Sequence, residues 1–170
     1  MISFKLRPHT CIEKIRIEGN LELIAEKIRL SFVVEGDLDG YIFPSKSRPQ
    51  RAKELWKLTC FELFLANENE EAYYELNFSP SLAWNFYYLS AYRSEVEELK
   101  LLNSPKIECF EAKNVFKIVF ELSIENLEKF ELYNVACILL NKEHERTFWT
   151  VKHLKSQPDF HDKASFLRIT

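Results

Sequence analysis

Hydrophobic and polar residues alternate along much of this chain with a period of two, which is typical of β-strands with one buried face. Over residues 28–34 every second residue is apolar, and the run ends at Gly36-Asp37, which predicts a strand followed by a turn. Alternation and turn residues predict eight more strands, over residues 58–65, 72–79, 84–92, 107–111, 115–122, 132–140, 147–154 and 166–169. Ser123 is placed to cap one short helix over residues 124–130.

A chain of roughly ten strands and one short helix indicates an all-β fold, and we expect a two-sheet antiparallel β-sandwich. Residues 37–57 contain Pro44 and Pro49 and follow no strand pattern, so they predict a long loop. Loops of this length inside a compact domain usually have a function. With 170 residues and 46% hydrophobic content, the chain is expected to form a single domain over residues 1–170.

Charge and cysteine usage narrow the classes of partner. The net charge of −3 argues against broad binding to nucleic acid or to an anionic membrane, because both need a basic field. The N-terminal residues MISFKLRPH lack the apolar run of a signal peptide, so we expect a cytoplasmic protein without a membrane span. The four cysteines form no C-x-x-C pair, which favours reduced thiols.

Residues 51–93 combine aromatic rings with carboxylate, amide and guanidinium groups on predicted strands. In residues 58–65, Glu62 shares one face with Cys60 and Phe64. In residues 72–79, Glu75 and Asn77 share one face with a tyrosine. Rings supply flat apolar contact and carboxylates supply directed hydrogen bonds, as in a face that binds a sugar or another small ring. The same composition also fits an aromatic core.

Several motifs carry a resemblance to a known family. These are LRPH at residues 6–9, GDL at 36–38, LWKLTCFELF at 55–64, YYELNFSPSLAW at 73–84, YR at 92–93 and FWTVKHLKSQPDFHDKASF at 148–166. Together they resemble the DOMON-like domains related to carbohydrate-binding module family nine, over nearly the whole chain. The resemblance implies a β-sandwich that binds a sugar or haem, and many free-standing members have no assigned activity.

In the sugar-binding relatives, two tryptophan rings clamp the sugar, and polar side chains bond its hydroxyl groups. The resemblance therefore implies a non-catalytic module for a carbohydrate or similar polar ring. The matching residues are Trp56 and Trp149 as the rings and Glu62, Glu75, Asn77 and Arg93 as the polar partners. The competing interpretation is that both tryptophans pack in the core and that Glu62 pairs with Arg93.

Three alternatives stay open. His153, Asp159 and His161 could hold a divalent metal, with Glu62 or Glu75 as the base of a hydrolase, or they could form a structural turn. Haem is disfavoured: Met1 is the only methionine, so ligation would need two of the four histidines. An exposed aromatic face could instead dock a partner protein or a second copy of the chain. We expect no catalytic residue and no certain cofactor.

Overall fold

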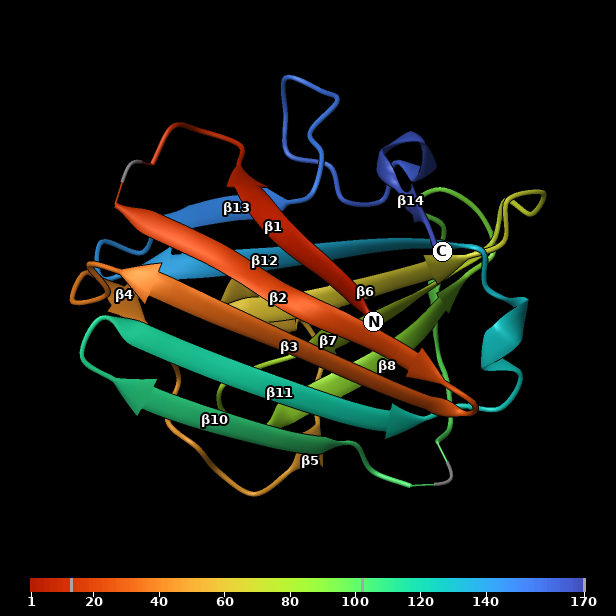
Figure 1. Ribbon diagram of the computed structural model, residues 1–170, viewed down its shortest axis with the longest axis horizontal. Helices are drawn as coiled ribbons and strands as arrows, with labels where there is room; N and C mark the ends of the chain where they lie inside the picture. The colour runs from red at the N-terminus through yellow and green to blue at the C-terminus, as the bar shows by residue number, and fades with distance from the viewer. Residues whose placement is uncertain (13, 102, 170) are drawn as a thin grey trace.

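The computed structural model describes residues 1–12, 14–101 and 103–169. Fourteen strands lie in these residues, and they hydrogen-bond into one sheet that curls back on itself (Figure 1). Three 3-10 turns accompany them: η1 (Leu55–Lys57), η2 (Leu127–Lys129) and η3 (Lys163–Ser165). The strands are β1 (Ile2–Pro8), β2 (Ile15–Ile24), β3 (Lys27–Gly36), β4 (Tyr41–Ile42), β5 (Gln50–Arg51), β6 (Cys60–Ala66), β7 (Tyr73–Phe78), β8 (Ala83–Leu89), β9 (Val96–Glu98), β10 (Lys106–Ala112), β11 (Val115–Ser123), β12 (Leu132–Asn141), β13 (Arg146–Thr150) and β14 (Leu167–Arg168).

The all-β class is confirmed, but the hydrogen bonding does not divide into two separate sheets. The order is β10-β11-β3-β2-β1-β13-β12-β6-β7-β8-β5, with β4 and β14 beside β12 and β9 beside β8. Strand β1 pairs with β2 and also with β13, through Arg7–Thr150 and Pro8–Trp149. This junction joins the two halves of the sheet, and the expected two-sheet arrangement is corrected to one continuous sheet of fourteen strands.

The main core lies between the two halves of the curled sheet. Strand β3 buries every second side chain, as its alternation predicts, and these include Phe32. From the other half, β6 contributes Phe61 and Leu63 to the same core, and the Phe32 and Phe61 ring centroids lie 5.0 Å apart. Aromatic pairs at this separation add packing energy beyond the area that they bury.

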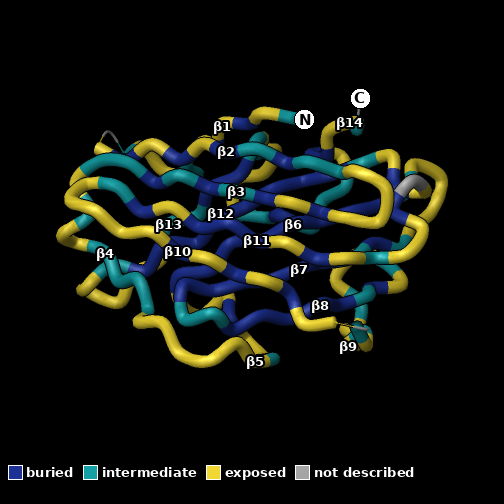
Figure 2. Tube along the Cα trace, turned by 60° about the horizontal axis from the view of Figure 1, so that its bottom comes forward, coloured by how far each residue is buried: buried dark blue, intermediate teal, exposed yellow. Residues whose placement is uncertain are grey.

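Strand β6 is buried along its whole length, unlike the strands that alternate (Figure 2). One face of β6 meets the main core, and the other carries Phe64 and Ala66 into a second cluster. That cluster includes Phe160 and Phe166, which come from the segment that follows β13. The chain end therefore folds over the outer face of β6, β7 and β8 and encloses the polar side chains of that face.

Several sequence predictions need correction at their boundaries. Residues 124–130 form only the 3-10 turn η2, whose N-cap Asn126 makes no side-chain cap hydrogen bond. The strand predicted over residues 147–154 ends at Thr150, and the long loop over residues 37–57 contains β4, β5 and η1. None of the helical turns in the described ranges has the length and apolar character needed to cross a membrane.

Alternation also exists in β1 and β2, which the sequence reading missed. In β2, buried residues recur at Ile15, Ile17, Gly19 and Leu21, but the glycine interrupts the apolar pattern. The glycine is required by a close approach: a Cβ atom on Gly19 would lie 1.9 Å from the carbonyl oxygen of Ser31.

Candidate functional site

Three neighbouring strands place acidic and amide side chains on one face of the sheet. In the strand register, Glu62 of β6 stands opposite Asn77 of β7, and Glu75 of β7 stands opposite Tyr87 of β8. Since side chains alternate between faces, these four residues point to the same side, away from the main core. The alternation in the sequence correctly predicts that Glu62, Glu75 and Asn77 share a face.

A cleft of about 340 Å³ opens on this face. Its floor contains Glu62 and Glu75, and its walls contain five aromatic or imidazole rings beside Arg93. The remaining members of the lining are smaller or apolar. The complete lining is Trp56, Glu62, Glu75, Tyr87, Leu89, Arg93, Ser94, Val96, Ile138, Phe148, Pro158, Phe160 and His161.

The two carboxyl groups of the floor are nearly enclosed by protein. Glu62 is 3% exposed and Glu75 is 6% exposed. Burial, together with the neighbouring charge of Glu75, raises the pKa of Glu62 well above its ordinary value. Burial raises the pKa of Glu75 to about 7, although the Asn77 amide and the Arg93 charge oppose the shift. The pair therefore retains a proton at pH values where exposed glutamates are fully ionised.

Asn77 orients Glu75 from beneath and does not line the cleft. Its Nδ2 donates a hydrogen bond of 2.7 Å to Glu75 Oε1. Its own Oδ1 is buried and has no hydrogen-bond partner among the described residues. Glu62 stands directly opposite Asn77 on the neighbouring strand.

His161 forms the side wall of the cleft next to Glu75. Its Nδ1 shares a hydrogen bond of 2.8 Å with the Tyr73 hydroxyl and lies 4.0 Å from Glu75 Oε2. Burial lowers the pKa of His161 to about 4, so the ring is neutral at pH 7. The contact with Glu75 is therefore no ion pair at that pH.

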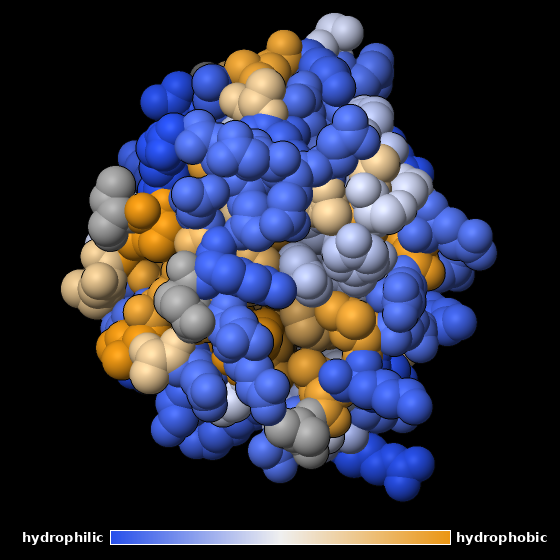
Figure 3. Space-filling model, turned by 90° about the vertical axis from the view of Figure 1, so that its right-hand side faces the viewer, coloured by the Kyte–Doolittle hydropathy of each residue, from blue (hydrophilic) through white to orange (hydrophobic). Residues whose placement is uncertain are grey.

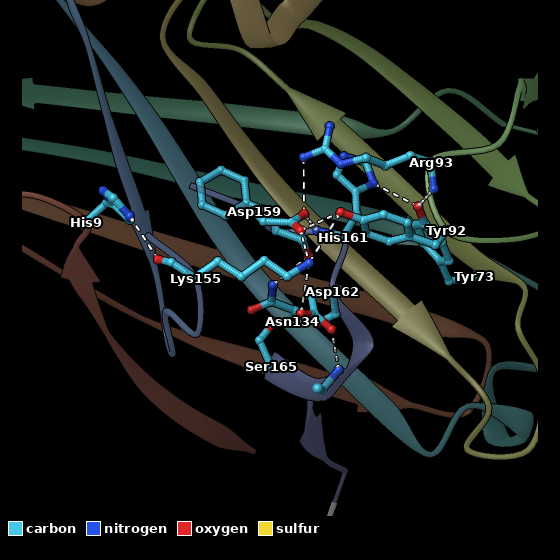
Figure 4. A network of polar contacts seen from close by, with 12 residues as sticks. His9, Tyr73, Tyr92, Arg93, Asn134, Lys155, Asp159, His161, Asp162 and Ser165 are labelled. Carbon is cyan, nitrogen blue, oxygen red and sulfur yellow. Dashed lines mark hydrogen bonds and ion pairs between the residues drawn. The ribbon is translucent and has the colours of Figure 1, made fainter. Parts of the chain in front are cut away.

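Asp159 holds the segment between β13 and β14 in place over the outer face of the sheet (Figure 4). Its carboxylate accepts hydrogen bonds from the Tyr92 hydroxyl (2.6 Å), Lys155 Nζ (2.7 Å), Arg93 (3.1 Å) and the His161 backbone N–H (3.1 Å). Burial raises the pKa of Asp159, but the Lys155, Tyr92 and Arg93 hydrogen bonds outweigh it and hold that pKa well below its ordinary value. Arg93 thus pairs with Asp159 and not, as one interpretation of the sequence held, with Glu62.

The three tryptophans have different surroundings. Trp56, in η1, is 37% exposed and stands at the rim of the cleft. Trp149 is 1% exposed and packs in the main core, so its ring cannot offer a face to a ligand in the cleft. Trp84 also belongs to the main core, where the Arg51 guanidinium lies 4.4 Å from its ring centroid. The expected clamp of Trp56 and Trp149 is therefore not assembled.

The sequence analysis missed three other rings that line the cleft together with Trp56, namely Tyr87, Phe148 and Phe160. Alternation could have found Tyr87, which shares a face with Asn85 on its strand. Phe148 stands opposite Ile138 in the pairing of β13 with β12, and no local signal reveals that pairing.

The predicted metal ligands serve other contacts. His153 shares a hydrogen bond of 2.9 Å with the Arg7 carbonyl oxygen, and its ring lies against His9 with centroids 5.1 Å apart. Asp159 is occupied by the four donors described above. Across the described part of the chain, no group of three or more His, Cys, Asp or Glu side chains has the geometry to hold a metal ion.

A hollow of about 440 Å³ adjoins the cleft at His161, but its carboxylates, Glu71 and Asp162, are not buried. Two further hollows that are larger than the cleft lie elsewhere on the surface. One, of about 480 Å³, runs beside β3 and β11 and contains no aromatic ring. The other, of about 610 Å³, contains rings such as Phe43, but its carboxylates, Asp39 and Glu111, are exposed. Only the smaller cleft on β6–β8, among these four, combines rings with enclosed carboxyl groups, which is the chemistry of a specific site.

Comparison with known proteins gives the fold alone. No family model matches the chain, and no curated protein matches it. Among solved structures, the chain is similar to a protein from Bacteroides uniformis ATCC 8492 that is described as a candidate carbohydrate-binding protein. The TM-score is 0.63 at 13% sequence identity, and the match covers 96% of this chain and 84% of that one.

Proposed function

We propose that this protein binds a carbohydrate or a similar polar ring compound in the cleft on β6, β7 and β8, without catalysing a reaction. The observation that carries the proposal is one enclosed carboxyl pair, Glu62 and Glu75, below a rim that includes Trp56. A sugar ring presents C–H faces that stack on an indole, and its hydroxyl groups bond to carboxyl groups.

The protonation state of the floor suits hydroxyl groups. A carboxyl group that keeps its proton can donate one hydrogen bond and accept others, as a sugar hydroxyl does. The fold shared with the Bacteroides uniformis protein supports the proposal, because that protein is described as a candidate carbohydrate-binding protein. Membership of the DOMON-like, family-nine-related group is part of this proposal and rests on the sequence motifs.

The alternatives have less support. A metal-dependent hydrolase would need ligands other than His153, Asp159 and His161, which are committed to separate contacts. A docking module would need a contiguous apolar patch. On the face in Figure 3, hydrophobic residues lie in several separate patches between hydrophilic side chains.

The proposal is tested by thermal melting and intrinsic tryptophan fluorescence against a panel of monosaccharides, disaccharides and sugar nucleotides. A saturable fluorescence change together with a raised melting temperature for one sugar class is expected. A flat response to the entire panel would contradict the proposal.

Replacing Trp56 with alanine should weaken the binding of that sugar at least about tenfold, since a stacked ring contributes about 1.4 kcal/mol or more. The free energy of unfolding should change by less than about 1 kcal/mol, because the side chain is partly exposed. Titration calorimetry measures the affinity without depending on Trp56 fluorescence. Leu58→Ala, an exposed neighbour, is the matched control and should bind normally. Normal binding by Trp56→Ala would exclude the rim as the stacking surface.

A further inference from the structure

The carboxyl pair of the cleft lacks a cation of its own. Glu62 lines the cleft at 3% exposure, and among the described residues its carboxyl group has no ion pair and no hydrogen bond from an N–H or O–H donor. The polar neighbour that favours its charged form is the weakly polar thiol of Cys60. A buried carboxylate without a donor or a cation is costly, and this cost falls when a ligand supplies the missing group.

The basic groups of the cleft are not available to neutralise the pair. Arg93 makes its ion pair with Asp159, at 3.1 Å, and acts on Glu75 only through space, without a hydrogen bond. His161 lies 4.0 Å from Glu75, but burial keeps its ring neutral at pH 7. Glu75 receives one neutral hydrogen bond, from the Asn77 amide. The floor therefore holds two acidic groups and no positive charge directed at them from these neighbours.

The spacing of the two carboxyl groups suits one small cation. Glu62 stands opposite Asn77, so Glu75 is its diagonal neighbour in the register. Diagonal residues of an antiparallel pair lie about 7–8 Å apart, and their Cβ atoms are somewhat closer. An ammonium group has three N–H donors and can reach a carboxylate oxygen on each side from a point between them.

The walls favour the same ligand chemistry. Trp56, Tyr87 and Phe148 line the cleft, and the faces of such rings attract an ammonium ion in addition to stacking on apolar surface. A neutral sugar would use the rings and the protonated carboxyl groups but would leave the pair without a cation. A ring compound that carries a protonated amine would use the rings and supply that cation.

We propose that the ligand of this cleft is an amine-bearing ring, such as an amino sugar, whose ammonium group binds between Glu62 and Glu75. This inference rests on the proposed function and narrows its ligand class. Ionised carboxylates bind an ammonium group most strongly, so the protons that Glu62 and Glu75 hold pass to the buffer as the ammonium enters. The release is expected below about pH 7, where Glu75 still holds a proton.

The experiment is titration calorimetry of the full chain with glucosamine, N-acetylglucosamine and glucose, which share one ring and differ at one substituent. The amine should bind at least about tenfold more tightly than the other two, as expected for a charge-assisted hydrogen bond. Repeating the titration at pH 6.5 in buffers of different ionisation heat counts the protons released. Galactosamine and its N-acetyl form extend the test to a second ring.

Glu62→Gln should remove the preference for the amine, lowering its affinity about tenfold and changing that of the neutral sugars little. Glu18→Gln, an exposed glutamate on β2, is the matched control and should keep the preference. Melting curves check that the variants fold. If Glu62→Gln does not fold, Glu75→Gln gives a second test of the same preference.

The outcomes separate this inference from the proposed function. If neutral and N-acetylated sugars bind as tightly as the amines, the ammonium assignment is overturned and the sugar cleft stands. If neither set binds, both proposals are contradicted. Amine binding that is unchanged by Glu62→Gln would also overturn the assignment.

Discussion

At the scale of single residues, burial controls the chemistry of the cleft. Glu75 is 6% exposed, and its pKa is raised to about 7, above the value near 4.3 expected in the unfolded chain. A raised folded-state pKa means that the folded protein binds the proton more tightly than the unfolded chain does. The contribution of Glu75 to stability is thus fully present below about pH 4.3 and is lost as the pH rises through 7.

Glu75→Gln should therefore become more stable relative to the wild type as the pH rises from 5 to 8. The expected change in the difference is on the order of 3 kcal/mol, from a shift of between two and three pKa units. Urea unfolding at a series of pH values measures it. The pKa of His161 is lowered to about 4, so this residue stabilises the folded state increasingly as the pH rises from 4 to 6.5. Because His161 is present in the wild type and in Glu75→Gln, its contribution largely cancels in the difference between them.

The matched control for this series is Glu18→Gln, whose difference from the wild type should stay flat with pH because the residue is exposed. If the difference in unfolding free energy between Glu75→Gln and the wild type were also independent of pH, Glu75 would ionise as it does in water. That result would remove the argument for a protonated carboxyl pair.

Residue patterns in the sequence predict part of this site. Alternation identified Glu62, Glu75 and Asn77 as neighbours on one face, because side-chain direction in a strand follows from position alone. It could not separate Trp56 from Trp149, because both rings fit a core or a rim equally well. Only the pairing of β13 with β1 and β12 shows that Trp149 points inward.

At the scale of elements, the segment between β13 and β14 closes the site. It has little regular structure of its own, and it is held down by Asp159 and by the burial of Phe160 and Phe166. Two of the groups that bond Asp159, Arg93 and the His161 backbone, belong to residues that line the cleft. The order of this segment and the shape of the cleft should therefore be linked.

Asp159→Asn should loosen this segment. The asparagine amide keeps one acceptor oxygen, but its N–H group would lie next to donors such as Lys155 and Tyr92 and could not accept their hydrogen bonds. We expect a loss of about 1–2 kcal/mol, limited because Lys155 and Arg93 are half exposed and screened by solvent. Hydrogen exchange over residues 152–162 should become faster, and sugar affinity should fall.

Asp39→Asn provides the control, since Asp39 is exposed in the turn before β4. Equal exchange rates and melting temperatures in the two variants would show that Asp159 does not order the segment. The sequence motif around residues 158–161 indicated an important loop, but it did not reveal that the donors come from residues 92 and 93. Contacts between distant parts of the chain have no local signature.

At the scale of the whole molecule, alternation predicted the fold class and nine of the fourteen strands in the described residues, but not how they connect. Strand β1 joins both halves of the sheet through two residue pairs with β13, Arg7–Thr150 and Pro8–Trp149. Such long-range pairing depends on register and cannot be read from a local pattern. Short strands such as β4 and β5 were missed because two residues carry no periodicity.

The central claim is that a sugar-like ring binds in the cleft on β6, β7 and β8. The most direct test is a nuclear magnetic resonance titration of the ¹⁵N-labelled protein with each sugar of the panel at millimolar concentration, following the three indole N–H signals. The account predicts that one sugar class shifts the Trp56 signal and the backbone signals of Glu62 and Glu75, while Trp84 and Trp149 move little. Shifts confined to the hollow beside β3 and β11, or an unchanged spectrum with every sugar, would contradict it.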